Sequence, residues 1–472
     1  MKLSKVKINF LYNIFYQVLI LVLPIITVPY VSRILKPEGV GVFSYTYSFA
    51  SYFVLLSMLG IANYGSRMIA KVRDDKKSLS REFLSIYTVQ VLSTVIMTFI
   101  YLITTLFLVR DYSVVRTIEI IYIISCLFDI TWFFYGLEKF KITVIRSTII
   151  KILSVISILL FVKSENDLYI YVLIQSLSVL ITSISVFPFL RRYIEPYKIE
   201  KEDIVKHVKP CIILFIPVIA VSLYKIMDKI MLGALANVEE VGFYEQAEKI
   251  INIPLGLITS LGLTLMPKIS NLVANKNVKL IKDYIYKSIK FVMFLSFPIV
   301  FGLISVAKDF IPLFLGDSFL SSVNILYFLS VTIIFISIGN IIIQEYLIPF
   351  EKDKIFIYSS FIGAIINLVL NFILITNYKS TGAAIATVFA EAFVVLYEIT
   401  SVRKVLDIKK YLKVGIPFFI KAFIMFIITF SISFLNINVI LKIIVEVLTG
   451  VIIYLLLNLS YIKEIIDIRI RK

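Results

Sequence analysis

Residues 83–109, FLSIYTVQVLSTVIMTFIYLITTLFLV, run for 27 residues without one charged side chain. A helix needs about 20 mostly apolar residues to cross the hydrocarbon core of a bilayer, so this stretch is long enough to span a membrane. The preceding residues, 67–81, carry six lysines and arginines. A long apolar stretch beside a basic loop is typical of a helical membrane protein, and it predicts an all-α, polytopic fold.

The same pattern continues along the chain and predicts fourteen transmembrane helices. Hydrophobic residues make up 60% of the sequence and the mean hydropathy is +0.96, far from the composition of a soluble domain. The predicted spans are residues 9–32, 41–65, 83–109, 117–137, 147–162, 168–190, 210–235, 241–267, 291–307, 320–349, 355–378, 380–402, 414–435 and 439–462.

Lysine and arginine residues gather in alternate loops. Eight basic stretches hold 35 of the 48 basic residues: 1–8, 67–81, 138–146, 191–209, 268–290, 351–354, 403–413 and 463–472. The positive-inside rule therefore predicts an even number of spans with both termini in the cytoplasm. This topology and the anionic lipid headgroups account for the net charge of +17, so no nucleic-acid partner is expected.

The chain also repeats itself. LPIITV at 23–28 resembles IPVIAV at 216–221, and LEKFKI at 137–142 resembles FEKDKI at 350–355. A Val-Gly pair at 40–41 and a Leu-Gly pair at 59–60 recur in the same order, at 241–242 and 261–262. The matches predict a duplicated unit of six spans and hence a parallel repeat, the kind of transporter whose site lies between its halves.

This repeat predicts three regions. An N-terminal six-helix lobe would cover residues 1–207, and a second six-helix lobe would cover 208–405. Residues 406–472 would add two further C-terminal transmembrane helices and a cytoplasmic tail.

Ionisable residues inside apolar segments are the main candidates for function. Lys225, Asp228 and Lys229 are spaced i, i+3 and i+4, so they crowd one face of the seventh predicted span. In the eighth span, Glu245 and Lys249 share a face. A charge at the bilayer centre costs about 2.5–3.5 kcal/mol, which implies a paired or hydrated setting.

Two interpretations of these charges are open. They can form a structural ladder of ion pairs between two helices, or they can line a wet cavity. In the cavity interpretation, Lys225, Lys229 and Lys249 bind an anionic substrate, while Asp228 and Glu245 are candidates for ion coupling.

Further polar residues in predicted spans extend the candidate site. Asn13, Gln17 and Trp132 are candidates for substrate binding, and Asp129 and Glu345 for ion coupling. The single histidine, His207, falls in a basic loop and no role is predicted for it. The chain has no GxxxxGK[ST] loop, HExxH, GxSxG or Asp-x-Asp pair, so neither enzymatic activity, nor a metal, nor a cofactor is expected.

Four stretches together resemble one family. They are ILKPEGVG at 34–41, GIANYGSR at 60–67, DITWFFYGLE at 129–138, and MDKIMLG at 227–233 followed by VGFY at 241–244. They are similar to the Wzx-type oligosaccharide flippases of the multidrug, oligosaccharidyl-lipid and polysaccharide exporter superfamily, over residues 5 to about 410.

The resemblance implies two six-helix lobes around a central cavity, plus two further helices. It implies alternating-access movement of undecaprenyl-pyrophosphate-linked repeat units across the bacterial cell membrane, for capsule, O-antigen or exopolysaccharide, powered by a cation gradient. The partners it implies are the lipid-linked oligosaccharide, membrane lipid and other polysaccharide-assembly proteins. By resemblance, the cavity charges would be Lys225, Asp228, Lys229 and Lys249.

Two alternatives remain open at this stage. A cation-coupled multidrug antiporter of the same superfamily would need a cavity richer in acids than in lysines. A membrane polysaccharide polymerase or glycosyltransferase would be expected to carry a sizeable outer loop or an Asp-x-Asp pair, and the sequence has neither.

Overall fold

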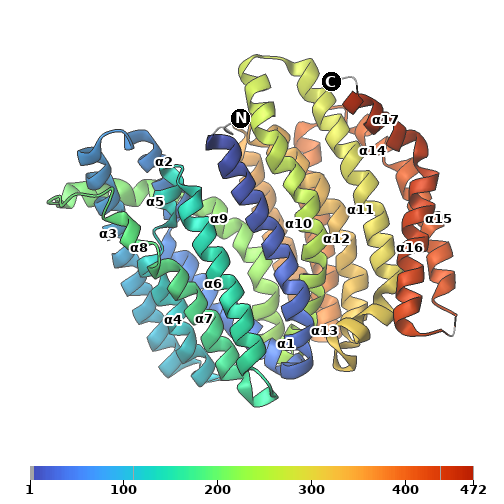
Figure 1. Cartoon of the computed structure of the whole chain (residues 1–472), viewed down its shortest axis with the longest axis horizontal. Coiled ribbons are helices and arrows are strands. Elements are labelled where there is room, and N and C mark those ends of the chain that lie inside the picture. Colours follow the sequence, from blue (N-terminus) through green and yellow to red (C-terminus); the bar gives the residue numbers. More distant parts are fainter. Residues whose placement is uncertain (1–4, 110, 436, 471–472) are drawn as a thin grey trace. The chain divides into compact units, whose positions relative to one another are not determined.

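The structure is a computed structural model that describes residues 5–109, 111–435 and 437–470. Within these ranges every regular element is a helix, which confirms the predicted all-α fold (Figure 1). The chain divides into two compact units, residues 1–242 and 243–472, and each is described by itself. The boundaries predicted at 207/208 and 405/406 stay predictions.

The first unit is a helical bundle. Its second long helix, α3, packs against α1 and α4, and α4 in turn packs against α7. Helix α9, predicted to begin the second lobe, packs against α1, α2 and α3 of this unit. The elements are α1 (Lys5–Met58), α2 (Ile61–Val72), α3 (Lys76–Ile103), η1 (Thr104–Leu108), α4 (Ser113–Phe128), α5 (Thr131–Gly136), α6 (Phe140–Phe161), η2 (Glu165–Asp167), α7 (Leu168–Ile184), α8 (Phe187–Leu190) and α9 (Lys201–Leu235).

The second unit begins within α10 and is built around α11. Helix α11 packs against α12, α15 and α16, and α12 packs against α13. The predicted C-terminal pair of helices is present as α15 and α16, and Tyr454 Oη donates to the Phe294 carbonyl oxygen at 2.8 Å. The elements are α10 (Val238–Ala274), α11 (Val278–Leu315), η3 (Asp317–Phe319), α12 (Ser322–Ile342), η4 (Ile343–Leu347), α13 (Asp353–Val402), α14 (Ile408–Lys413), α15 (Ile416–Ile432), α16 (Val439–Leu457) and α17 (Leu459–Ile470).

Eleven helices in the described residues are long and apolar enough to cross a membrane. Two of them contain a backbone break that separates two helices, at Lys36 (φ 56°) in α1 and at Lys379 (φ 49°) in α13. Helix α10 is not among the eleven. The structure therefore supports many spans, and the count of fourteen stays a prediction.

One pair of repeated sequence segments has a similar backbone. Glu138 and Glu351, which occupy the same place in LEKFKI and FEKDKI, both adopt a left-handed φ, of 58° and 55°. The amide of the next residue closes the same turn in each copy, from Lys139 to the Phe134 carbonyl and from Lys352 to the Leu347 carbonyl, both at 2.8 Å. Two sequence segments related by 213 positions thus make the same kind of helix-ending turn, which agrees with the predicted duplication; Lys276 and Asn277 end α10 with a turn of this kind as well.

The repeated Val-Gly pair also contacts its own copy. A β-carbon at Gly41 would collide with the Val238 carbonyl oxygen, and one at Gly242 would collide with the Pro37 carbonyl oxygen. Residues 37 and 238, like 41 and 242, are related by the offset of 201 found in the sequence. Each copy therefore presents the same two positions to the other, and glycine is needed because the backbones touch.

An aromatic core holds α2, α3 and α5 together. Trp132 is 1% exposed, stacks on Phe83 with ring centroids 5.6 Å apart, and donates from Nε1 to Gln90 Oε1 at 2.9 Å. Gly65 of α2 lies against the indole face with no space for a side chain. This core fixes α2 beside α3, and α9 packs on both.

Gly65→Ala is expected to destabilise the protein by about 1–3 kcal/mol, because a methyl group would overlap the Trp132 ring in a filled core. Gly302→Ala is the matched control, since a β-carbon at Gly302 has no atom within 4 Å. Thermal unfolding of the detergent-solubilised protein measures both. Equal melting temperatures for the two variants would contradict the packing described for Gly65.

Candidate functional site

The ionisable residues of α9 differ in exposure. Asp228 is 2% exposed, Lys229 is half-buried and Lys225 is exposed. Both Asp228 and Lys229 have interaction partners. The sequence predicted that the three share a face, and the structure adds that the carboxylate is the buried member of the group. A buried carboxylate between lysines is a site where charge is compensated locally.

Helix α9 holds Asp228 against α1. Tyr52 Oη of α1 donates to the Ser222 carbonyl oxygen at 3.4 Å, and Gly233 leaves room for the ring of Tyr45. These contacts lie on either side of Asp228 along α9. The two helices are therefore in close contact where the acid is, and a movement of α9 relative to α1 would change its surroundings.

In α10, Glu245 and Lys249 form an ion pair. Lys249 Nζ lies 3.0 Å from Glu245 Oε1, at i and i+4 of one helix, with Glu245 buried and Lys249 half-buried. This pairing within one helix agrees with the structural interpretation for these two residues. Because Lys225 and Lys249 lie in different units, a shared ion-pair ladder or cavity stays a prediction.

Glu345 is the most isolated of the predicted acids. It is fully buried, and neither carboxyl oxygen makes a hydrogen bond within the described residues. It lies in η4, one turn of π-helix directly after α12, and such turns are frequent at functional sites. An uncompensated buried carboxylate is costly, so binding a proton or a cation would stabilise it.

A further polar cluster lies between the two halves of α13. Ser359 Oγ donates to Glu398 Oε1 at 2.9 Å, and Asn371 Nδ2 donates to Asn367 Oδ1 at 3.0 Å. Glu391 is also buried there. The candidate set drawn from the sequence omitted these residues, although their seven- and four-residue spacings on a helix were a usable signal.

Asp129 and Trp132 both make contacts that stabilise the local fold. Asp129 Oδ1 accepts from the Thr131 backbone amide at 3.1 Å and from Thr131 Oγ1 at 2.6 Å, which forms a local turn just before the short helix α5. Trp132 is enclosed in the core. Contact of Trp132 with a ligand would require this packing to open, whereas Asp129 is half-buried. Asn13 and Gln17 lie outside the part of the chain whose side chains are described.

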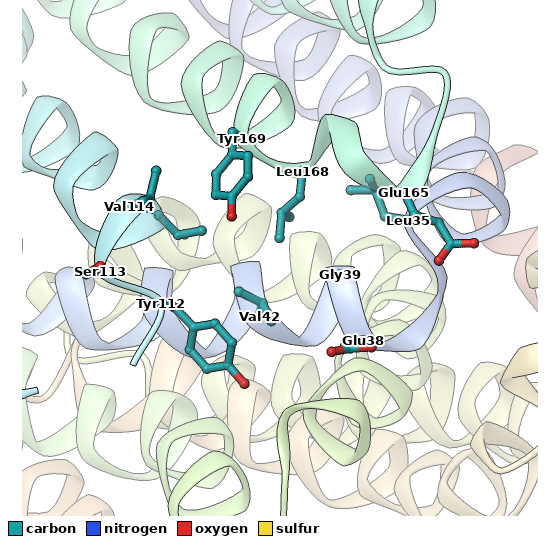
Figure 2. A pocket seen from close by; sticks show the side chains of 11 residues that line it. Leu35, Glu38, Gly39, Val42, Tyr112, Ser113, Val114, Glu165, Leu168 and Tyr169 are labelled. Carbon is teal, nitrogen blue, oxygen red and sulfur yellow. The ribbon is translucent and has the colours of Figure 1, made fainter. Parts of the chain in front are cut away.

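Figure 2 shows a pocket in the first unit that the sequence did not predict. It has a volume of about 400 Å³. Tyr112 and Tyr169 lie toward one end of it, and Glu38 and Glu165 toward the other (Figure 2). Glu165 is paired with Lys36 at the break in α1. The pocket is formed by turns between helices and lies apart from Asp228.

Known protein families match this chain. The family model described as polysaccharide biosynthesis protein matches residues 6–273, more than half of the chain. The chain belongs to the polysaccharide biosynthesis protein family. A second family model, MatE, matches residues 210–373 of the chain. The two matches confirm the resemblance to the oligosaccharide flippases that the four sequence stretches indicated.

This polysaccharide biosynthesis protein has a relative named "Putative O-antigen transporter" from Shigella dysenteriae, 28% identical over 80% of this chain and 96% of the relative. Its fold matches the inward closed conformation of the lipid II flippase MurJ, with a TM-score of 0.73 and 17% identity over 97% of this chain and 99% of MurJ. It also matches an inward-facing multidrug resistance MATE transporter of the MOP superfamily, with a TM-score of 0.61 and 13% identity over 86% of this chain and 96% of the transporter. The family member is thus a multi-pass membrane protein with the MurJ and MATE fold.

Proposed function

We infer that this chain is a flippase that moves lipid-linked oligosaccharides across the membrane. The single observation that carries this inference is its similarity to a putative O-antigen transporter over 96% of that protein's length. The MurJ fold and the ionisable residues held within α9 and α10 agree with it. A transporter of this kind needs no cofactor, and transport rather than catalysis is the proposed activity.

The proposal extends to the form of the substrate and the direction of movement. The substrate is an undecaprenyl-pyrophosphate-linked repeat unit, carried to the outer leaflet by alternating access for capsule, O-antigen or exopolysaccharide assembly. The exposed Lys225 and half-buried Lys229 attract the pyrophosphate, and the polyprenyl chain stays in lipid. Both termini are cytoplasmic, and other polysaccharide-assembly membrane proteins supply and receive the repeat unit.

Reconstitution in proteoliposomes tests the function. A lipid-linked oligosaccharide with a fluorescent glycan is placed in both leaflets, and a membrane-impermeant quencher reports how fast the inner pool becomes accessible. Full quenching with the protein, against about half in empty vesicles, supports the proposal. Quenching equal to that of empty vesicles, from protein shown to be folded, would overturn it.

A second candidate, a cation-coupled multidrug antiporter, is favoured by the MATE fold match. The lysines Lys225, Lys229 and Lys249 argue against it, because a cationic drug would be repelled where an anion is attracted. The same vesicles loaded with a fluorescent organic cation separate the two candidates. Cation efflux without oligosaccharide movement would favour the antiporter.

Within the flippase, Glu345→Gln is expected to lower the transport rate about tenfold or more and to remove its dependence on an imposed pH or cation gradient. Glu345 is buried and makes no hydrogen bond within the described residues, and we propose that a proton or cation compensates its charge and exchanges during transport. Transport rates with and without a gradient measure this. Unchanged gradient dependence in the variant would assign ion coupling elsewhere.

A further inference from the structure

The chain's single histidine lies in an enclosed polar cluster. His207 is 1% exposed and belongs to the second turn of α9, not to a loop as its basic sequence context had predicted. Its Nδ1 lies 2.7 Å from Tyr64 Oη of α2, and its Nε2 lies 3.2 Å from Glu82 Oε2 of α3. The imidazole therefore joins three helices of the first unit, which pack against one another.

The charged groups around this histidine are balanced without it. Lys206 Nζ of α9 binds Glu82 Oε1 at 2.6 Å, and Arg81 Nε of α3 donates to Asp203 Oδ1 of α9 at 2.8 Å. Two cations and two anions leave no net charge. A neutral imidazole keeps this balance, whereas an imidazolium adds one positive charge to a buried site.

Only Nδ1 of the imidazole has a hydrogen-bond partner among the described residues, and that partner suits both the neutral and the charged ring. The Tyr64 hydroxyl can donate to a bare Nδ1 or accept from a protonated one. On the other side, Nε2 makes no hydrogen bond within the described residues, although Glu82 Oε2 is close, so the two are poorly aligned. In the packed arrangement burial disfavours a charged ring, whereas the nearby Glu82 carboxylate favours it.

The contact between α2 and α9 is made by backbone. Gly60, at the start of α2 with φ 72°, lies against the Cys211 carbonyl and the Phe215 amide, one to two turns beyond His207. A side chain at Gly60 would force these helices apart. A separation of α2 from α9 would expose the imidazole to water.

We propose that His207 is a proton-binding site, which takes up a proton when α9 separates from α2 and α3 and releases it when they close. The groups that face the ring are Tyr64 on α2, Arg81 and Glu82 on α3, and Asp203 and Lys206 on α9. Helix α9 continues from this site to Asp228, about 30 Å further along its axis. Opening at one end of α9 is thereby linked to proton concentration at that end, and this link to transport rests on the flippase function.

Because the chain has one histidine, a histidine-selective isotope label gives a single imidazole signal to follow by NMR in nanodiscs. The signal is expected to titrate once between about pH 5 and about pH 8. Glu82→Gln removes a facing anion and moves the midpoint to lower pH, and Lys206→Gln removes a facing cation and moves it to higher pH. Lys209→Gln, exposed on the same helix, is the matched control and leaves the midpoint in place.

An imidazole signal that does not shift over this range, or a midpoint that neither Glu82→Gln nor Lys206→Gln moves, would overturn the proton site. This measurement needs no transport, so it stands or falls independently of the flippase function.

Transport provides the second test. In proteoliposomes, the rate of the native protein is expected to differ at least about threefold between pH 6 and pH 8, and His207→Gln is expected to bring that ratio close to one. A variant with the native pH profile would refute the coupling of His207 to movement. Absence of oligosaccharide movement in the native protein, together with a normal imidazole titration, would refute the flippase function and leave the proton site intact.

Discussion

Replacing Asp228 by alanine is expected to reduce surface polymer to below about one-tenth of the native level while the amount of protein in the membrane stays nearly normal. Asp228 is buried in α9 against α1, close to Lys225 and Lys229. Its loss leaves cationic side chains without a compensating anion and removes a carboxylate that can bind a coupling cation. Polymer and protein are both measured by immunoblot in a strain that lacks its own O-antigen flippase.

Two further variants separate charge from packing. Asp228→Asn keeps the size of the side chain and is expected to be as defective as alanine. Glu446→Gln changes an equally buried carboxyl in α16, outside the predicted lobes, and is expected to leave the polymer at the native level. Normal polymer in Asp228→Ala would make the residue structural, and a defect of the same size in Glu446→Gln would show that any buried acid matters.

Lys225→Ala is expected to lower the transport rate about tenfold, whereas Lys421→Ala changes it less than about twofold. Lys225 is an exposed cation in α9, three residues before Asp228, and it is proposed to attract the pyrophosphate. Lys421 lies in α15, and its Nζ donates to Asn458 Oδ1 at 3.2 Å. Both substitutions remove one lysine from a predicted span. Any difference between their transport rates therefore reflects the position of the lysine and not the number of charges.

Initial rates in proteoliposomes measure this difference, with Lys225→Arg included to restore the charge. If the lysine attracts an anion, Lys225→Arg recovers part of the rate and the native rate falls as salt is raised. Equal effects of the two alanine substitutions would refute the assignment of Lys225 to the substrate path.

The sequence allowed the membrane fold to be predicted because its signal is long and local. A run such as 83–109 needs no tertiary information, and α3 with η1 covers it closely (Figure 1). The repeat was also visible, since LEKFKI and FEKDKI keep enough identity to mark one turn. The π-helical turn at 343–347 was not predictable, because a change in hydrogen-bond register leaves the apolar pattern unchanged.

Site residues were harder to assign, because an acid in an apolar segment has more than one use. Asp129 was a candidate for ion coupling, which stays a prediction; the chain leaves the helical conformation there and the carboxylate accepts from Thr131. His207 was passed over because it follows a basic stretch, while α9 begins six residues earlier, at Lys201, and buries it. In both cases the deciding fact is where a helix starts or stops, and sequence patterns define that poorly.

The reciprocal contact of Gly41 with Val238 and of Gly242 with Pro37 has an evolutionary consequence. When equivalent positions of two segments touch each other in this mutual way, the arrangement is that of a symmetric homodimer. A half-length ancestral polypeptide would have met a second copy of itself through these glycines. Fusion of two such genes would leave each half free to diverge, while neither glycine can be exchanged without separating the touching main chains.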